Sequence, residues 1–164
     1  KDQDDCESAW AFSAIAAFES AIAIKTGQLK TLSEQELVDC SADYHNSGCK
    51  GGTNTFALDY IIDKQIALDE DYPYTGKGQI CSIKSERPRF ELKARETISP
   101  LDVNGLIKAI EETPVSVAIE VQLDFIFYEE GVYTNYGECG KDLNYFLTMV
   151  GYKNEEGEDI SRFW

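Results

Sequence analysis

Few side chains in this sequence could act as a nucleophile or a base. The chain has five cysteines and one histidine, His45, and thiolate chemistry or a zinc site is built from these residue types. No set of them has the spacing of metal ligands, and the sequence contains no glycine-rich phosphate loop. Two serines, Ser8 and Ser13, begin and continue an apolar segment, whereas His45 lies in a polar loop where we expect it to be exposed. We therefore predict no cofactor and no metal.

The segment from Gln3 to Ser13 nevertheless resembles a known active-site motif. It reads Q-D-D-C-E-S-A-W-A-F-S, which is similar to the Q-G-x-C-G-S-C-W-A-F-S segment of papain-like cysteine proteases. The nucleophilic cysteine of that family corresponds to Ala9, and two of its glycines correspond to Asp4 and Glu7. Its oxyanion-hole glutamine corresponds to Gln3. The resemblance thus implies a protease scaffold that lacks its reactive thiol.

Further landmarks of this family occur in order along the chain. They are S-E-Q-E-L-V-D-C at residues 33–40, G-C-K-G-G at 48–52, Y-P-Y at 72–74, P-V-S-V at 114–117, G-V-Y at 131–133, L-N-Y at 143–145 and V-G-Y at 150–152. The resemblance implies an α+β, papain-like fold that is incomplete at both ends. Residues 1–95 would form its helical left domain and residues 96–164 part of its strand-rich, barrel-like right domain, together one domain of the catalytic type.

The family's second catalytic residue is also replaced. Its histidine lies in a motif like L-N-H-A-V and corresponds to Tyr145 in the sequence Leu143–Leu147. A phenol titrates near 10, roughly three units above neutrality, and is a poor general base at neutral pH. Phe146 replaces a small residue, and we expect both aromatic side chains to fill the space above Ala9. By resemblance, the binding cleft would be lined by Glu7, Trp10, Gly51, Gly52, Asn144 and Phe146.

Five cysteines leave one without a partner within the chain. The family pattern implies disulfides between Cys6 and Cys49 and between Cys40 and Cys81, and it leaves Cys139 unpaired. Family members begin roughly 15 to 20 residues before Lys1 and continue roughly 50 residues beyond the end of this sequence, as typical domain sizes allow. Disulfides imply the secretory pathway, a lysosome or vacuole, or the extracellular space. Free thiols would instead suit an intracellular assembly.

Three functions are compatible with these residues. The first is a pseudoprotease with a binding or structural role in a larger assembly, and the second is a pseudoprotease that binds peptide in the remaining cleft. The third is an active cysteine endopeptidase disabled by a deliberate Cys→Ala substitution, although Tyr145 would remain unexplained. The expected partner is a protein or an extended peptide. A net charge of −15 disfavours nucleic acid, and no apolar run reaches the roughly 18 residues of a membrane span.

The elements that must position these residues follow from periodicity. Residues 9–26 are apolar on nearly every side, which predicts a buried helix ended by Gly27. Ser33 and Glu36 predict a capping box for a second helix ending near Cys40. Helices are also expected over residues 54–64 and 102–112, the latter stopped before Pro114. Alternation predicts strands over 115–121, 127–134 and 145–152.

Overall fold

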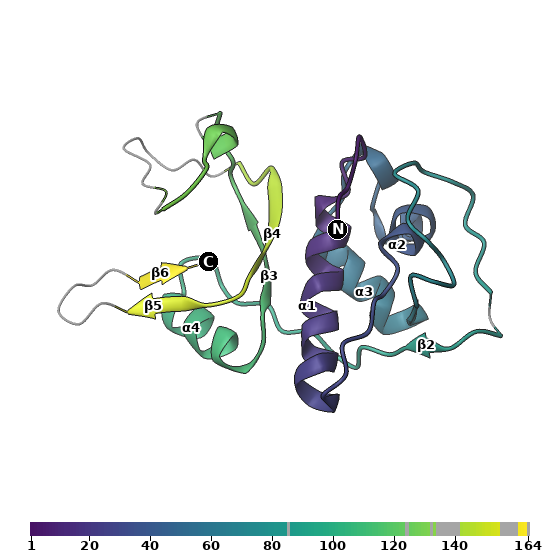
Figure 1. Ribbon diagram of the computed structural model, residues 1–164, viewed down its shortest axis with the longest axis horizontal. Helices are drawn as coiled ribbons and strands as arrows, with labels where there is room; N and C mark the ends of the chain where they lie inside the picture. The colour runs from purple at the N-terminus through teal and green to yellow at the C-terminus, as the bar shows by residue number, and fades with distance from the viewer. Residues whose placement is uncertain (85, 124, 132, 134–141, 155–160, 164) are drawn as a thin grey trace.

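The chain folds into a helical part and a strand-bearing part that meet along one helix (Figure 1). A computed structural model describes the chain except residues 85, 124, 132, 134–141, 155–160 and 164. The α-helices are α1 (Ala9–Thr26), α2 (Glu34–Cys40), α3 (Asn54–Lys64) and α4 (Val103–Glu112), and the 3-10 helices are η1 (Ala42–Tyr44), η2 (Gly48–Lys50) and η3 (Phe125–Phe127). The strands are β1 (Ile66–Ala67), β2 (Arg89–Phe90), β3 (Val115–Ile119), β4 (Tyr145–Met149), β5 (Tyr152–Asn154) and β6 (Ser161–Phe163).

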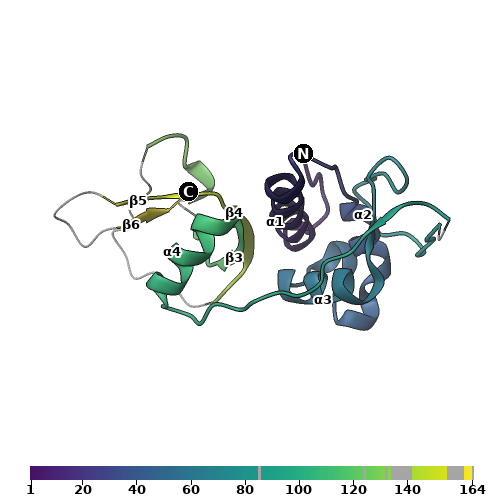
Figure 2. The same cartoon turned by 90° about the horizontal axis from the view of Figure 1, so that it is seen from below.

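Helix α1 is central to this arrangement. It lies between α2 and α3 on one side and the β3–β4 ribbon on the other, as both views of the ribbon agree (Figure 2). Gly27 ends the helix with a φ of 71°, a left-handed conformation that glycine adopts without steric cost. The expected burial holds for the first turns only, because Ile24 is 62% exposed in the last turn.

The start of α2 differs in part from the expected capping box. The Ser33 hydroxyl accepts a hydrogen bond from the Glu36 N–H, as predicted. The Glu36 carboxylate does not return to Ser33; it accepts hydrogen bonds from the Tyr60 hydroxyl and the Ala67 N–H and pairs with the guanidinium of Arg89. Glu36 is fully buried, so its charge needs these donors. It therefore joins α2 to α3, β1 and β2.

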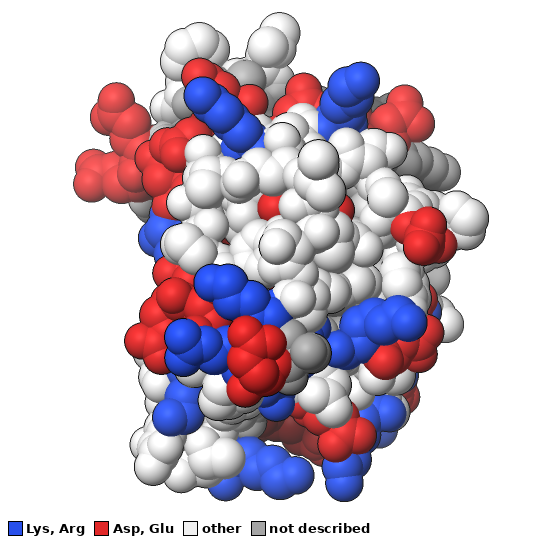
Figure 3. All heavy atoms as spheres, turned by 90° about the vertical axis from the view of Figure 1, so that its right-hand side faces the viewer, with Lys and Arg blue, Asp and Glu red and all other residues white. Residues whose placement is uncertain are grey.

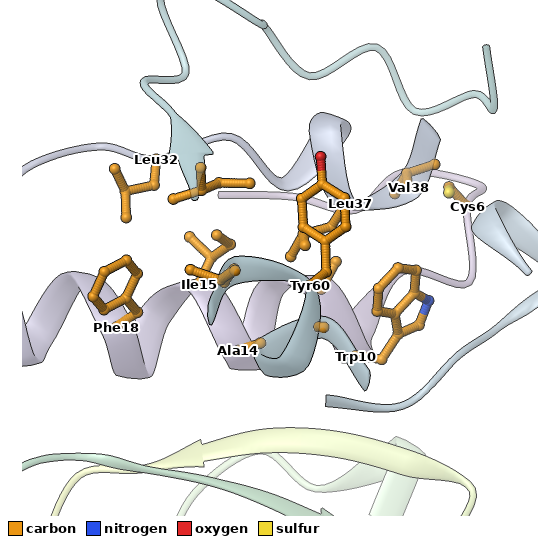
Figure 4. Packing of buried hydrophobic residues seen from close by; sticks show 13 residues of the cluster. Cys6, Trp10, Ala14, Ile15, Phe18, Leu32, Leu37, Val38 and Tyr60 are labelled. Atoms are coloured by element: carbon orange, nitrogen blue, oxygen red, sulfur yellow. The ribbon is translucent and has the colours of Figure 1, made fainter. Parts of the chain in front are cut away.

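The hydrophobic core lies on the side of α1 that faces away from β4 (Figure 4). Trp10, Ile15 and Phe18 of α1 pack there against Leu37 of α2 and Tyr60 of α3. Among the described residues, all that are fully buried belong to the range 6–67. The helical part consequently provides most of the burial that stabilises the fold.

The strand-bearing part consists of antiparallel ribbons. β3 pairs with β4 from Val115↔Met149 to Ile119↔Tyr145, and β5 pairs with β6. The predicted strand at 145–152 is divided into β4 and β5. The strand predicted at 127–134 is wrong for residues 127–131 and 133, which form the end of η3 and irregular backbone; the rest of that range lies outside the described residues.

The surface of the helical part carries charges of both signs. On the face that Figure 1 shows at the right, acidic and basic side chains are interspersed around an uncharged area (Figure 3). The negative net charge is therefore not concentrated in one patch on this face.

Candidate functional site

A cavity of about 430 Å³ lies where α1 meets β4. Ala9, Gln3, Tyr145 and Phe146, which are distant in sequence, all line it. Such a volume falls within the range of about 300 to 1,000 Å³ that is typical of ligand pockets. The structure thus brings together the three positions where the resemblance placed the nucleophile, the base and the oxyanion donor.

One face of α1 forms a wall of this cavity. Ala9, Phe12, Ala16 and Glu19 line it, at spacings of three and four residues that place side chains along one helical face. The small side chains of Ala9 and Ala16 leave the space open. Ala9 is the first residue of the helix, where a thiolate would be stabilised by the helix dipole, but its methyl group offers no nucleophile.

Hydrogen bonds hold the segment before α1 in place. The Tyr74 hydroxyl donates to the Gln3 carbonyl oxygen at 2.8 Å and lies 2.8 Å from the Ser8 hydroxyl. The Gln3 side-chain amide donates to the Cys6 carbonyl oxygen at 3.0 Å. Ser8 is fully buried, so its hydroxyl supports the loop and does not reach the cavity as a nucleophile. Tyr74 was not identified as a positioning residue from the sequence, although it belongs to the Y-P-Y landmark.

The opposite wall is strand β4, which is bonded to α1. The Ser13 hydroxyl donates to the Leu147 carbonyl oxygen at 2.6 Å. Ser13 also meets the Ser116 hydroxyl of β3, which accepts a 2.8 Å hydrogen bond from the Asn54 amide of α3. Ser13 is 3% exposed, as expected of a buried helix residue. This network fixes the distance between the walls.

The expectation that aromatic side chains would fill the space above Ala9 is wrong. Tyr145 and Phe146 border an open cavity, and Tyr145 is 37% exposed. Both side chains border this space without closing it. Phe146 packs against the hydrophobic core.

The other residues expected in the cleft do not line this cavity. Glu7 is exposed, and Asn144 bonds to the backbone of Val121 through both its amide oxygen and its amide nitrogen. Trp10 is buried beneath Gly52, where an added Cβ would lie 2.8 Å from the indole ring, and Gly51 has a φ of 105°. His45 is exposed and contacts the ring of Phe56.

Three charged residues that the sequence reasoning missed lie at the far end of the cavity. The Lys1 ammonium donates to the Glu34 carboxylate at 2.6 Å and to the Glu19 carboxylate at 3.0 Å. Burial raises the pKa of Glu34, although Lys1 opposes that rise. Burial would lower the pKa of Lys1, but hydrogen bonds and attraction from both carboxylates outweigh it and raise that pKa. No local pattern links these residues, so only the fold could identify them.

Both disulfides implied by the resemblance are present in the structure. Cys6 is bonded to Cys49 and Cys40 to Cys81, with Cα–Cα distances of 4.5 and 4.9 Å. The first bond joins the segment before α1 to η2, and the second joins the end of α2 to the segment after Tyr74. Cys139, expected to be unpaired, lies outside the described residues.

Within the described part of the chain, we find no group of His, Cys, Asp and Glu side chains arranged to hold a metal ion. None of the helices described is both long and apolar enough to cross a bilayer.

Comparisons with known proteins agree with this architecture. The profile of the papain family of cysteine proteases matches residues 1–164. Vignain from Ricinus communis is 43% identical over 167 residues, which cover 100% of this chain and 45% of the relative. A KDEL-tailed cysteine endopeptidase of Arabidopsis thaliana is 41% identical over 167 residues, with the same two coverages.

Solved structures give the same result. Digestive procathepsin L 3 of Tenebrio molitor larval midgut superposes with a TM-score of 0.89 at 37% identity, covering 96% of this chain and 52% of that one. A cysteine protease of Carica candamarcensis superposes with a TM-score of 0.85 at 34% identity, covering 93% and 70%.

The helical part, the antiparallel ribbons and the cavity at the start of α1 define a papain-like α+β fold. The chain belongs to the papain family of cysteine proteases. It spans about 45% of the length of the curated relatives given above.

Proposed function

We propose that this chain is a non-catalytic homologue of papain-family peptidases that binds an extended polypeptide in the cavity between α1 and β4. The observation that carries the proposal is the open cavity of about 430 Å³ beside Ala9. Acyl transfer in this family needs a thiolate and a base, whereas Ala9 and Tyr145 stand at the corresponding positions. Binding needs neither group.

The walls of the cavity suit a polypeptide chain. Phe12 and Phe146 provide apolar surface, and Gln3 provides a polar side chain at the same cavity. Ligand sites commonly combine a mainly apolar lining with a few polar groups that fix orientation. We place the protein in the secretory pathway, because its relatives include a KDEL-tailed endopeptidase and the two disulfides suit an oxidising compartment.

A structural role in a larger assembly is the second candidate. It is favoured by the apolar side chains that the strand-bearing part exposes, among them Leu101 at 99%, Leu123 at 78% and Phe127 at 80%. Exposed apolar surface of this kind marks contact with another polypeptide when it is contiguous. The two roles are compatible, since these residues do not line the cavity.

The proposal is tested by filling the cavity. We would measure binding of a fluorescein-labelled Gly-Leu-Lys-Leu-Gly amide to the 164-residue chain by fluorescence anisotropy. Ala16→Phe should weaken binding roughly tenfold or more, because a bulky side chain then occupies the ligand space. Ala42→Phe, on the exposed η1, is the matched control and should not change binding. Equal binding by the chain and Ala16→Phe, with unchanged melting temperatures, would reject this site.

A further inference from the structure

The two disulfides of the chain differ in their access to solvent. Cys40 and Cys49 are both partly buried against the hydrophobic core, but their partners differ. Cys6 is 1% exposed, whereas Cys81 is exposed. Thiol–disulfide exchange requires a thiolate to reach one of the two sulfur atoms, so access controls its rate. A dissolved thiol can therefore approach the second bond from the side of Cys81, while the fold shields the first bond.

Loop length does not distinguish the two bonds. The bonded cysteines are 43 residues apart in the first disulfide and 41 residues apart in the second. The loss of chain entropy that a disulfide imposes on the unfolded state varies only with the logarithm of this separation. A difference in how readily the two bonds are reduced must therefore come from their surroundings.

Charge around the two bonds differs in the same sense as access. Three exposed carboxylates lie within residues 4–7, next to Cys6, and they repel an anionic thiolate. Lys77 and Lys84 are exposed on either side of Cys81 along the chain. Among the described residues, no carboxylate lies within ion-pair distance of either ammonium group. Positive charge attracts an anionic reductant and stabilises a cysteine thiolate.

The second disulfide ties a lightly held segment, Gly78–Lys84, to α2. Every residue of this segment is exposed and lies outside the helices and strands, at the edge of the molecule opposite the β3–β4 ribbon (Figure 1). The Gln79 N–H donates to the Asp39 carboxylate, and the Ser82 N–H donates to the Tyr72 hydroxyl. The two isoleucine side chains of the segment are 90% and 41% exposed, so packing holds it only weakly.

The backbone that precedes this segment is held independently of the disulfide. Gln35 is fully buried; its side chain accepts a hydrogen bond from the Thr75 N–H at 2.8 Å and donates to the Lys77 carbonyl oxygen at 2.7 Å. Tyr74 bonds to the Gln3 carbonyl oxygen beside the cavity. Loss of the disulfide should therefore free the chain after Lys77 and leave the wall of the cavity in place.

We propose that Cys40–Cys81 is a redox switch, which a small thiol or a dithiol protein reduces while Cys6–Cys49 persists, and that its reduction releases Gly78–Lys84 from α2. A thiolate of the reductant attacks the Cys81 sulfur, the disulfide breaks, and Cys40 leaves as a thiolate that takes up a proton. A second thiol of the reductant resolves the mixed disulfide. Two thiols of the reductant are thus oxidised to one disulfide, and both cysteines are reduced. This inference is independent of the proposed function, because the switch lies outside the cavity.

Differential alkylation tests the order of reduction. The 164-residue chain carrying Cys139→Ser, which removes the fifth cysteine from exchange, is incubated with reduced glutathione at neutral pH. Samples are quenched with N-ethylmaleimide, and the labelled cysteines are identified by peptide mass spectrometry. We expect Cys40 and Cys81 to be labelled together, about tenfold faster than Cys6 and Cys49, while the thermal unfolding transition persists.

Reductants of different charge test the role of the two lysines. Lys77→Glu/Lys84→Glu should slow reduction by anionic glutathione severalfold. The same variant should leave reduction by cysteamine nearly unchanged, because the ammonium group of cysteamine offsets the charge of its thiolate. Lys108→Glu, exposed on α4, reverses the same charge elsewhere on the molecule and should change neither rate.

Trypsin reports release of the segment. Cleavage after Lys84 should be about tenfold faster once Cys40–Cys81 is reduced, because a released segment can enter a protease active site. Cys40→Ala/Cys81→Ala should be cleaved at the faster rate with or without glutathione.

Each of the other outcomes contradicts the switch. Reduction of both disulfides at one rate, or of Cys6–Cys49 first, would show that the chain has no selectively reducible bond. Loss of the thermal unfolding transition as soon as Cys40–Cys81 opens would show that this bond is structural. Equal trypsin cleavage of oxidised and reduced chains would show that it does not hold the segment. Should Cys40→Ala/Cys81→Ala fail to fold, the order of alkylation in the chain that retains both bonds still decides the question.

Discussion

The Ser13 hydroxyl donates a 2.6 Å hydrogen bond to the Leu147 carbonyl oxygen, and this contact joins α1 to β4. The Thr148 hydroxyl returns a longer bond of 3.4 Å to the Ser13 carbonyl oxygen. These bonds cross the boundary between the helical and strand-bearing parts, directly beside the cavity. They hold the two walls in register, and the small side chains of Ala9 and Ala16 leave space between them.

Removing this contact should destabilise the protein. Ser13→Ala removes the hydroxyl that bonds to the Leu147 carbonyl and meets the Ser116 hydroxyl, which we expect to lower the free energy of unfolding by about 1 kcal/mol. Ser20→Ala removes a hydroxyl that bonds to the Ala16 carbonyl of its own helix and should cost about 0.5 kcal/mol or less. Urea unfolding measures both. If the two variants lose the same free energy of unfolding, the contact between Ser13 and β4 contributes no more stability than a bond within one helix.

The buried ion pair between Glu36 and Arg89 gives a second prediction. The side chain of Glu36 is fully buried and that of Arg89 is 12% exposed. Arg89→Met should destabilise the protein by about 3 to 5 kcal/mol, because a buried carboxylate loses its compensating charge.

The matched control is Arg95→Met. Arg95 pairs with Asp59 at 2.7 Å, but their side chains are 27% and 38% exposed, and such pairs contribute about 0 to 1 kcal/mol. A loss for Arg89→Met no larger than that for Arg95→Met would contradict this account of the core.

Tyr72 should make stability depend on alkaline pH. Burial, with a hydrogen bond to Asp39, raises the pKa of Tyr72 to about 12, whereas an unfolded tyrosine titrates near 10. Above pH 10 the unfolded chain therefore loses this proton while the folded chain retains it. The contribution of Tyr72 to stability is complete below pH 10 and is lost between about pH 10 and 12.

Unfolding with urea at several alkaline pH values tests this contribution. Tyr72→Phe should show a shallower fall in stability across that interval than the unmodified chain. Parallel pH profiles for the two proteins would show that ionisation of Tyr72 is not coupled to folding.

Restoring the thiol alone should not restore proteolysis. In Ala9→Cys the helix N-terminus assists ionisation of the cysteine, but Tyr145 provides no imidazolium beside it. We expect Ala9→Cys/Tyr145→His to react with iodoacetamide at about pH 6 roughly tenfold faster than Ala9→Cys. Rapid alkylation and peptide cleavage by Ala9→Cys alone would show that the tyrosine is no obstacle.

Local patterns were sufficient to predict most helices. α3 occupies residues 54–64 as expected, because Thr53 caps its first turn through the Phe56 N–H, and the Ser33 cap starts α2 as predicted. The two-residue strands β1 and β2 were missed, since such short pairings depend on contacts between distant segments. The strand predicted at 127–134 failed where the structure describes it, because Phe127 ends η3 and residues 128–131 and 133 have irregular backbone.

The site could be predicted only in part. Resemblance to the family placed Ala9, Gln3 and Tyr145, and all three line one cavity. The buried carboxylates could not be identified in this way, because Glu34 sits in a motif that reads as a helix start and Glu19 in an apolar helix. Their proximity to Lys1 results from tertiary packing. The sequence also could not predict that the cavity is open, because this depends on how Tyr145 and Phe146 of β4 are oriented.

The central claim is that the chain holds peptide without cleaving it. The most direct measurement is mass spectrometry of Gly-Leu-Lys-Leu-Gly amide recovered from its complex with the 164-residue chain after separation by gel filtration. We predict that the peptide co-elutes with the protein and is recovered intact, because Ala9 offers no thiolate for attack. Recovery of cleaved fragments, prevented by a substitution that fills the cavity, would contradict the account.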